Sequence, residues 1–212
     1  MLKINEIYKS IQGESSKAGL PCTFIRLTYC NLRCTYCDSE YAFYEGKEME
    51  IESVISEVKK LECNLVEVTG GEPLFQKESF ELMRKLCDEG FEVMLETGGS
   101  LPIENVDKRV MIILDLKCPS SGMMKKNLYE NVYHLKQSDE IKFVIGTRED
   151  YEWTKEKIIE LALNQKCRLL FSTVFDSLNP QNVIEWILED KLNVRFQLQM
   201  HKYIWDPKTK GV

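Results

Sequence analysis

The chain has 212 residues and a formal charge of −6, with 28 Lys and Arg against 34 Asp and Glu. This acidic balance excludes a broad phosphate-binding surface, so direct nucleic-acid binding is not expected. No apolar run approaches the roughly 20 residues that span a bilayer, and residues 1–10 lack the continuous apolar core of a signal peptide. We therefore expect no membrane association and one cytoplasmic domain over residues 1–212, whose eight cysteines stay reduced.

Extended and helical patterns alternate along the chain. Residues 2–11 predict an extended segment, and residues 22–28, rich in β-branched and aromatic side chains, predict the first core strand. In residues 51–61 the apolar positions recur at i, i+3, i+4 and i+7, which is typical of a helix. Further strands are predicted at 65–69, 91–95, 110–115, 140–145, 168–174 and 194–200, and further helices at 76–89, 127–136, 150–164 and 180–189.

Strands that alternate with helices at this spacing indicate a mostly parallel sheet with helices outside it. About seven strands follow the amino-terminal segment, fewer than the eight that close a full barrel. The predicted fold is α/β, an incomplete TIM-type barrel of about six to seven mostly parallel strands. The extended segment 1–20 is expected to contribute to the site.

Three cysteines, Cys30, Cys34 and Cys37, follow the first core strand at C-x3-C-x2-C spacing. Three thiolates can hold three irons of a [4Fe-4S] cluster and leave the fourth iron free to bind a small molecule and pass it an electron. A structural zinc site is an alternative, although it needs four ligands and no fourth is obvious. A thioredoxin-like dithiol is another, although it would use only two of the cysteines.

Other candidate residues lie at turns and strand ends. A Gly-Gly-Glu sequence at 70–72 follows a predicted strand and presents free backbone amides. A Gln-Gly-Glu turn at 12–14 either faces a cleft or is an ordinary surface turn. Arg26, inside the first core strand, either forms a structural ion pair or holds a ligand carboxylate.

The cysteine motif, an aromatic residue just before its third cysteine and the sequence Thr-Gly-Gly-Glu-Pro at 69–73 together resemble the radical S-adenosylmethionine superfamily. A narrower resemblance covers nearly the whole chain. The sequences at 11–14, 24–27, 37–39, 96–100, 115–121 and 199–202 are similar to those of the 7-carboxy-7-deazaguanine synthase family.

This resemblance implies a carbon-nitrogen lyase that converts 6-carboxy-5,6,7,8-tetrahydropterin into 7-carboxy-7-deazaguanine with release of ammonia, in queuosine or deazapurine biosynthesis. It implies a [4Fe-4S] cluster, S-adenosylmethionine and Mg2+ as cofactors, an electron donor such as flavodoxin or ferredoxin, and a homodimer. The alternatives are a glycyl-radical-enzyme activating enzyme and a non-catalytic iron-sulfur or zinc module. An activating enzyme has no need of Arg26 or the turn at 12–14 to grip a small carboxylate, and a non-catalytic module should not cleave S-adenosylmethionine.

The resemblance also assigns residues to roles. Cys30, Cys34 and Cys37 would hold the cluster that generates the radical, and Ser39 would bind Mg2+. The predicted substrate residues are Ile11, Gln12, Gly13, Glu14, Arg26, Thr69, His201 and Val212. The predicted S-adenosylmethionine residues are Tyr36, Asp38, Gly70, Gly71, Glu72, Glu96, Ser100, Asp115 and Lys117. For Glu72 and Glu96, helix capping or ion pairing is the alternative. His201 is expected near the end of the last strand.

Overall fold

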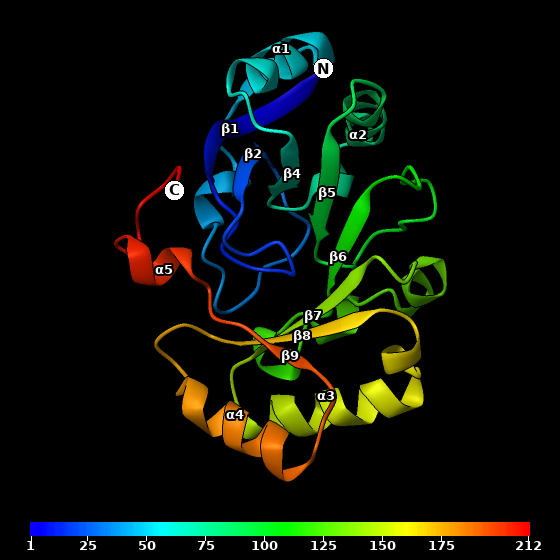
Figure 1. Ribbon diagram of the computed structural model, residues 1–212, viewed down its shortest axis with the longest axis vertical. Coiled ribbons are helices and arrows are strands. Elements are labelled where there is room, and N and C mark those ends of the chain that lie inside the picture. Colours follow the sequence, from blue (N-terminus) through cyan, green and yellow to red (C-terminus); the bar gives the residue numbers. More distant parts are fainter.

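One open sheet of nine strands organises the chain (Figure 1). The computed structural model describes residues 1–212. The strand order is β3-β1-β2-β4-β5-β6-β7-β8-β9. The strands are β1 (Leu2–Ile11), β2 (Pro21–Leu27), β3 (Lys47–Met49), β4 (Leu65–Gly70), β5 (Glu92–Thr97), β6 (Met111–Asp115), β7 (Glu140–Ile145), β8 (Arg168–Thr173) and β9 (Arg195–Phe196).

The sheet is parallel from β2 to β9, whereas β1 and β3 add an antiparallel edge. Strands β3 and β9 form the two ends of the order and do not pair with each other, so the barrel stays open. The predicted incomplete barrel is confirmed. The extended segment predicted at 2–11 is β1, which pairs with β2 along most of its length.

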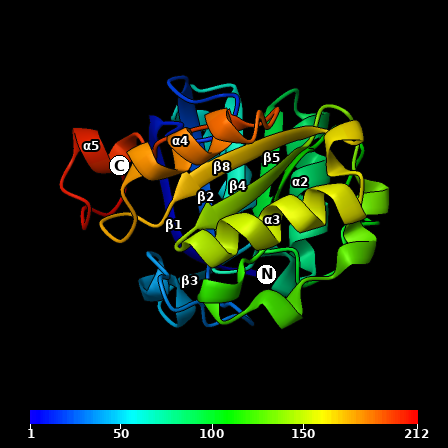
Figure 2. The ribbon, with the colours of Figure 1, turned by 90° about the horizontal axis from the view of Figure 1, so that it is seen from below.

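Helices cover the outer face of the sheet, with α3 and α4 outside β7 and β8 (Figure 2). The α-helices are α1 (Ile51–Lys60), α2 (Glu78–Asp88), α3 (Arg148–Glu160), α4 (Pro180–Glu189) and α5 (His201–Ile204). Two begin at capping residues: Thr147 accepts a hydrogen bond from the Asp150 amide at 3.1 Å, and Asn179 accepts one from the Gln181 amide at 3.0 Å. None of the helices combines the length and the apolar composition needed to cross a bilayer.

The helix predicted at 127–136 is wrong, because short 3-10 turns replace it at Met124–Lys126 and Tyr129–His134. Two asparagines hold this segment to neighbouring loops through the backbone. Asn127 bonds both the amide and the carbonyl of Lys117, and Asn131 donates to the Leu101 carbonyl at 2.9 Å. Side chains that bond backbone in this way compete with regular helix formation.

The last predicted strand, 194–200, is also wrong over most of its length. Only Arg195–Phe196 pairs as β9, and the chain then leaves the sheet to meet the turn after β1. There the Met200 amide donates to the Gly13 carbonyl at 3.0 Å. His201 consequently begins the short helix α5 instead of ending a strand, and the edge strand β3 was not predicted.

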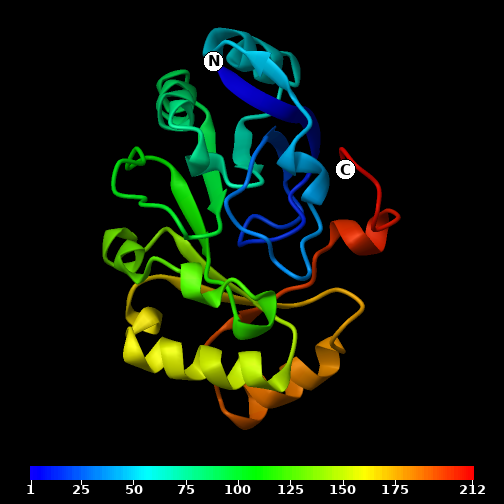
Figure 3. The ribbon, with the colours of Figure 1, turned by 180° about the vertical axis from the view of Figure 1, so that it is seen from behind.

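The segment after β9 spans the open side of the barrel. Figure 3 shows α5 and the carboxyl terminus beside the chain that follows β2. Two contacts hold these parts together: the Lys202 Nζ donates to Asp38 at 2.7 Å, and the Lys210 Nζ lies 4.3 Å from the centre of the Tyr41 ring. The opening left by the missing barrel strands is therefore bordered by the end of the chain.

Candidate active site

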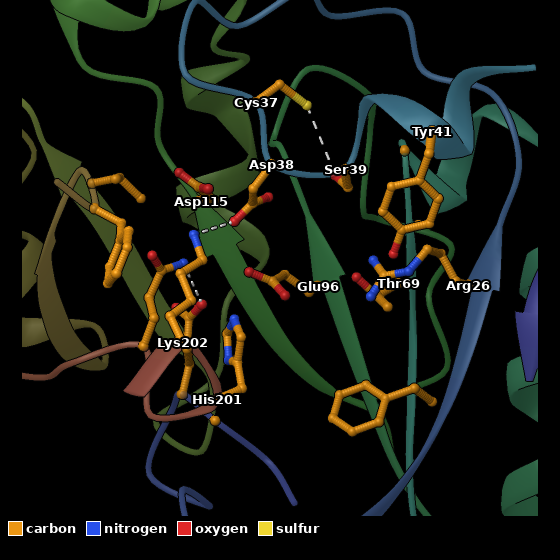
Figure 4. A pocket seen from close by; sticks show the side chains of 18 of the residues that line it. Arg26, Cys37, Asp38, Ser39, Tyr41, Thr69, Glu96, Asp115, His201 and Lys202 are labelled. Atoms are coloured by element: carbon orange, nitrogen blue, oxygen red, sulfur yellow. Dashed lines mark hydrogen bonds and ion pairs between the residues drawn. The ribbon is translucent and has the colours of Figure 1, made fainter. Parts of the chain in front are cut away.

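A cavity of about 670 Å³ occupies the inside of the open barrel. It extends from the cysteine loop, at the carboxyl ends of the strands, to the turn after β1, and residues 207–212 form part of its wall. Figure 4 shows Cys37 and Asp38 at one end and Glu96 between Arg26 and Lys202. All of the predicted site residues line this cavity except Glu72 and Ser100.

The cysteine loop lies at the carboxyl end of β2, as predicted. Its three cysteines are free and half-buried. The loop is anchored to the segment after β6, because the Thr35 hydroxyl donates to the Ser120 carbonyl at 2.7 Å and the Thr35 amide to the Ser121 carbonyl at 3.1 Å. These bonds fix the loop while its sulfurs face the cavity.

The glycines after β4 allow the cysteine loop to approach closely. A Cβ on Gly71 would lie 2.2 Å from the Tyr29 carbonyl oxygen and 2.8 Å from the Cys30 Cβ. Gly70 has a φ of 150° and packs equally tightly on the Leu27 carbonyl. Any larger side chain at either position would force the two strand ends apart.

Glu72 is fully buried beneath this contact and lies outside the cavity lining. Its carboxylate accepts hydrogen bonds from the Thr97 hydroxyl at 2.8 Å, from the Gly98 amide at 2.8 Å and from the Leu74 amide at 3.1 Å. The side chain thus caps a short 3-10 turn and joins the ends of β4 and β5. Glu72 therefore has the capping role that the sequence offered as an alternative, and its position outside the lining gives it no direct contact with a cofactor in the cavity.

Ser100 likewise lies outside the cavity lining and accepts a hydrogen bond from the Asn31 side chain at 3.0 Å. By contrast, Asp115 lies in the wall with its Oδ2 paired to the Lys117 Nζ at 2.7 Å, and its buried Oδ1 has no partner. An unpaired buried oxygen at a cavity wall is suited to accept a hydrogen bond from a bound molecule.

These residues fit a cluster with one open iron. No three His, Cys, Asp or Glu side chains are arranged to hold a single metal ion. The three free cysteines line one cavity, and three protein sulfurs on a four-iron cluster leave its fourth iron open. Burial raises the pKa of Cys34 to about 11 although Lys117 opposes the shift, so binding of iron must displace thiol protons.

Arg26 crosses the wall formed by β1 and β2. Its Nε donates to Glu6 at 2.7 Å and its Nη2 to the Tyr8 hydroxyl at 3.0 Å, while Nη1 makes no hydrogen bond within the chain. Aromatic rings surround it, since Tyr8 stacks on Phe24 at 5.1 Å and Tyr41 lies 5.7 Å from the guanidinium. The structural ion pair is therefore present, and one donor still faces the cavity.

The floor of the cavity contains a buried ion-pair network. Lys142, whose side chain is 6% exposed, lies 2.5 Å from Glu14 and 2.8 Å from Glu96. Burial alone would lower the pKa of Lys142, but the two carboxylates outweigh it and raise this pKa well above its ordinary value. Glu14 also accepts from the Gln199 side chain at 2.9 Å. Through Lys142 the network holds two carboxylates close together: Glu14, a predicted substrate-binding residue, and Glu96, a predicted S-adenosylmethionine-binding residue.

Gln12 lies on the same floor, held from both sides. Its Oε1 accepts from the Glu14 amide at 3.1 Å, and its Nε2 donates to the carboxyl group of Glu67. Burial and then the negative charge of Glu96 raise the pKa of Glu67 to about 8. At neutral pH a large share of Glu67 therefore carries a proton.

His201 closes the cavity from the carboxyl-terminal side. Its ring packs so closely on Gly13 that a Cβ there would lie 2.2 Å from the His201 Nδ1. Burial lowers the pKa of His201, although Glu14 opposes the shift, so the neutral imidazole is favoured. Val212 lines the same side of the cavity.

Several cavity residues were not predicted as site residues. Among them are Tyr8, Phe24, Tyr41, Glu67, Lys142, Lys202 and the residues from 207 to 211. For Glu67 and Lys142 the signal was present, because a charged residue in the middle of an otherwise apolar strand needs a polar partner inside the barrel. For the carboxyl-terminal residues no local pattern indicated that they fold back.

Comparison with known proteins agrees with this geometry. The profile described as the Radical SAM superfamily matches residues 24–189, more than half of the chain, and defines the class of protein. The chain is 46% identical to the 7-carboxy-7-deazaguanine synthase of Chlorobaculum tepidum, over 100% of this chain and 97% of that protein. It is also 46% identical to the synthase of Koribacter versatilis, over 100% of both chains. The chain belongs to the 7-carboxy-7-deazaguanine synthase family of the radical SAM superfamily.

A solved structure shares the fold. The crystal structure of QueE from Escherichia coli matches with a TM-score of 0.78 and 22% identity, over 94% of each chain. Archaeal TYW1 matches more distantly, with a TM-score of 0.56 and 13% identity over 82% of this chain and 72% of that one. The partial barrel is thus common to these proteins.

The raised pKa of Glu67 predicts a pH dependence of stability. The unfolded carboxyl loses its proton near pH 4.5, the folded one near pH 8, so the folded state binds more protons between these values and its stability falls as pH rises. Relative to Glu67→Gln, the free energy of unfolding of the wild type should therefore decline from pH 5 to pH 8, by at most about 1.4 kcal/mol per pH unit. Urea unfolding of the reduced proteins under argon measures this, and parallel pH profiles would refute the shift.

Proposed function

We propose that this chain catalyses the radical ring contraction of 6-carboxy-5,6,7,8-tetrahydropterin to 7-carboxy-7-deazaguanine, with release of ammonia. Relatives that it matches along nearly their whole length are named as synthases of that product, which supports the proposal. One observation carries the proposal: the cysteine loop, the glycine-rich strand ends and the Gln-Gly-Glu turn at 12–14 line one cavity. An electron source and a small polar substrate can therefore meet in a space that the chain encloses.

When bound, a [4Fe-4S] cluster supplies one electron to S-adenosylmethionine, whose cleavage yields the radical that takes hydrogen from the carbon bearing the substrate carboxylate. Cys30, Cys34 and Cys37 would hold that cluster. The backbone at Gly70 and Gly71, kept free of side chains by the close approach of the cysteine loop, would face the amino acid part of S-adenosylmethionine.

The walls at Asp115 and Glu96 offer acceptors for the rest of S-adenosylmethionine. The unpaired Oδ1 of Asp115 is one such acceptor. Lys117 pairs with Asp115 and Lys142 pairs with Glu96, so both carboxylates are fixed in position. The protein's part here is orientation, which lowers the entropic cost of bringing the reacting groups together.

The substrate would lie between Arg26 and the floor. The free Nη1 of Arg26 can donate to the substrate carboxylate, and the charge-assisted bond is stronger than a neutral one. The stacked rings of Tyr8 and Phe24 provide a flat apolar wall for the planar pyrimidine half of the substrate. Gln12 and Glu14 then face its polar edge from below.

Further features of the active enzyme belong to the same proposal. Ser39, whose hydroxyl lies 3.8 Å from the Cys37 sulfur, would bind Mg2+ together with substrate oxygens. A single hydroxyl is a weak site alone, which suits an ion shared with the substrate. The enzyme would work in the cytoplasm as a homodimer and receive electrons from a flavodoxin or ferredoxin.

The activity itself is directly testable. The chain, reconstituted anaerobically with iron and sulfide and reduced with dithionite, should form 7-carboxy-7-deazaguanine from the carboxy-tetrahydropterin and S-adenosylmethionine, detected by mass spectrometry. Cys34→Ala, which removes one cluster ligand, serves as the inactive control. A preparation with four irons per chain that yields no such product would show that the proposed function is wrong.

Arg26 allows a sharper test of the substrate pose. Arg26→Ala should lower kcat/KM by roughly 10- to 100-fold, because one or more charge-assisted hydrogen bonds to the carboxylate are lost. Arg26→Lys keeps the positive charge but lacks the planar guanidinium group. Its kcat/KM should lie between those of the wild type and Arg26→Ala. Iron content and melting temperature provide the control, since Arg26 also pairs with Glu6. Equal losses of cluster assembly and turnover would mean that Arg26 is only structural.

A further inference from the structure

One acidic residue in the cavity has no counter-charge. Five side-chain carboxylates line the cavity: Glu14, Asp38, Glu67, Glu96 and Asp115. Four of them form an ion pair with a lysine, whereas Glu67 forms none. A buried carboxylate without a counter-charge is costly, so Glu67 favours its protonated form in the chain alone and would ionise for a ligand that supplies hydrogen-bond donors.

The position of Glu67 in the sheet explains why no lysine reaches it. On β4 its side chain points into the barrel on the same face as Thr69, two residues later. Its neighbours in register are Phe24 on β2 and Met94 on β5, both buried and apolar. Glu67 is 3% exposed, and what remains accessible faces the cavity.

The hydrogen bonding of Glu67 leaves acceptor capacity for a ligand. Its Oε2 accepts from the Gln12 amide group, and its Oε1 accepts nothing within the chain. Gln12 is in turn fixed by the Glu14 amide, so the carboxyl group is held at a defined place on the floor. In its ionised form the Glu67 carboxylate can accept two parallel N–H bonds, as a carboxylate does from a guanidinium group.

A 2-amino-4-oxopyrimidine ring presents such a pair, because its exocyclic amino group and its adjacent ring N–H point in the same direction. We propose that Glu67 is a specificity-determining residue that accepts these two N–H bonds and so selects a 2-aminopyrimidone over a 2-oxo ring. This inference rests on the proposed function, since it places the pyrimidine half of the substrate on the cavity floor.

Two non-reacting ligands test the inference by binding alone. 6-Carboxypterin carries the 2-amino group, and 6-carboxylumazine has a carbonyl in its place. In the lumazine complex the 2-carbonyl oxygen would face the Glu67 carboxylate, so two hydrogen-bond acceptors would meet without a donor. The reconstituted wild type with S-adenosylmethionine should bind carboxypterin at least tenfold more tightly than carboxylumazine, measured anaerobically by ligand fluorescence.

Glu67→Gln keeps an acceptor for Gln12 but replaces the second acceptor by a donor. It should weaken carboxypterin binding at least tenfold and reduce or reverse the preference, because its amide can donate to the lumazine carbonyl. Affinity for S-adenosylmethionine and iron content should not change. Glu189→Gln, on the exposed face of α4, is the matched control and should keep wild-type values.

The outcomes separate this inference from the proposed function. If the wild type forms product but shows no preference between the two ligands, or if Glu67→Gln keeps the wild-type affinity and preference, Glu67 serves only to hold Gln12 and the inference is wrong. If the wild type neither forms product nor binds carboxypterin, the proposed function fails and the inference with it.

Discussion

The parallel pairing of β2 with β4 is the constraint on which the rest of the site depends. Leu27 lies beside Gly70 in this pair, and beyond them the Gly71 amide donates to the Leu27 carbonyl at 3.1 Å and the Glu72 amide to the Tyr29 carbonyl at 2.8 Å. These bonds join the ends of β2 and β4 so closely that neither Gly70 nor Gly71 has room for a Cβ. Since both strands run in the same direction, the cysteine loop and the glycine-rich turn meet at one rim of the barrel.

From that rim to the floor, the cavity is organised by charge. Lys117 and Lys142 lie among the acidic residues of the wall and hold their carboxylates in place through ion pairs. Such networks are stable only when each member finds a partner. The exception, Glu67, is 3% exposed and lines the cavity, where a bound ligand can supply the partner that the chain does not.

Much of the fold was predictable because its strands and helices are regular. β7 and α4 begin and end at the predicted residues, since apolar alternation and an Asn-Pro start are strong local signals. The site residues were predictable where they form contiguous motifs, such as the cysteine triplet. The last strand was predicted too long because residues 197–212 are shaped by contacts with the turn at 12–14 and with Tyr41, which no nearby sequence reveals. Lys142 gave a local signal, as a charged residue inside an apolar strand, but its partners Glu14 and Glu96 are distant in sequence and could not be identified from that signal.

The central claim is that the substrate carbon bearing the carboxylate lies next to S-adenosylmethionine within one enclosed cavity. Because the proposed reaction takes hydrogen from that carbon and restores S-adenosylmethionine afterwards, the measurement is isotope transfer. Substrate deuterated at this carbon should place deuterium in the 5′ position of recovered S-adenosylmethionine. Product formation without any such deuterium would contradict the account.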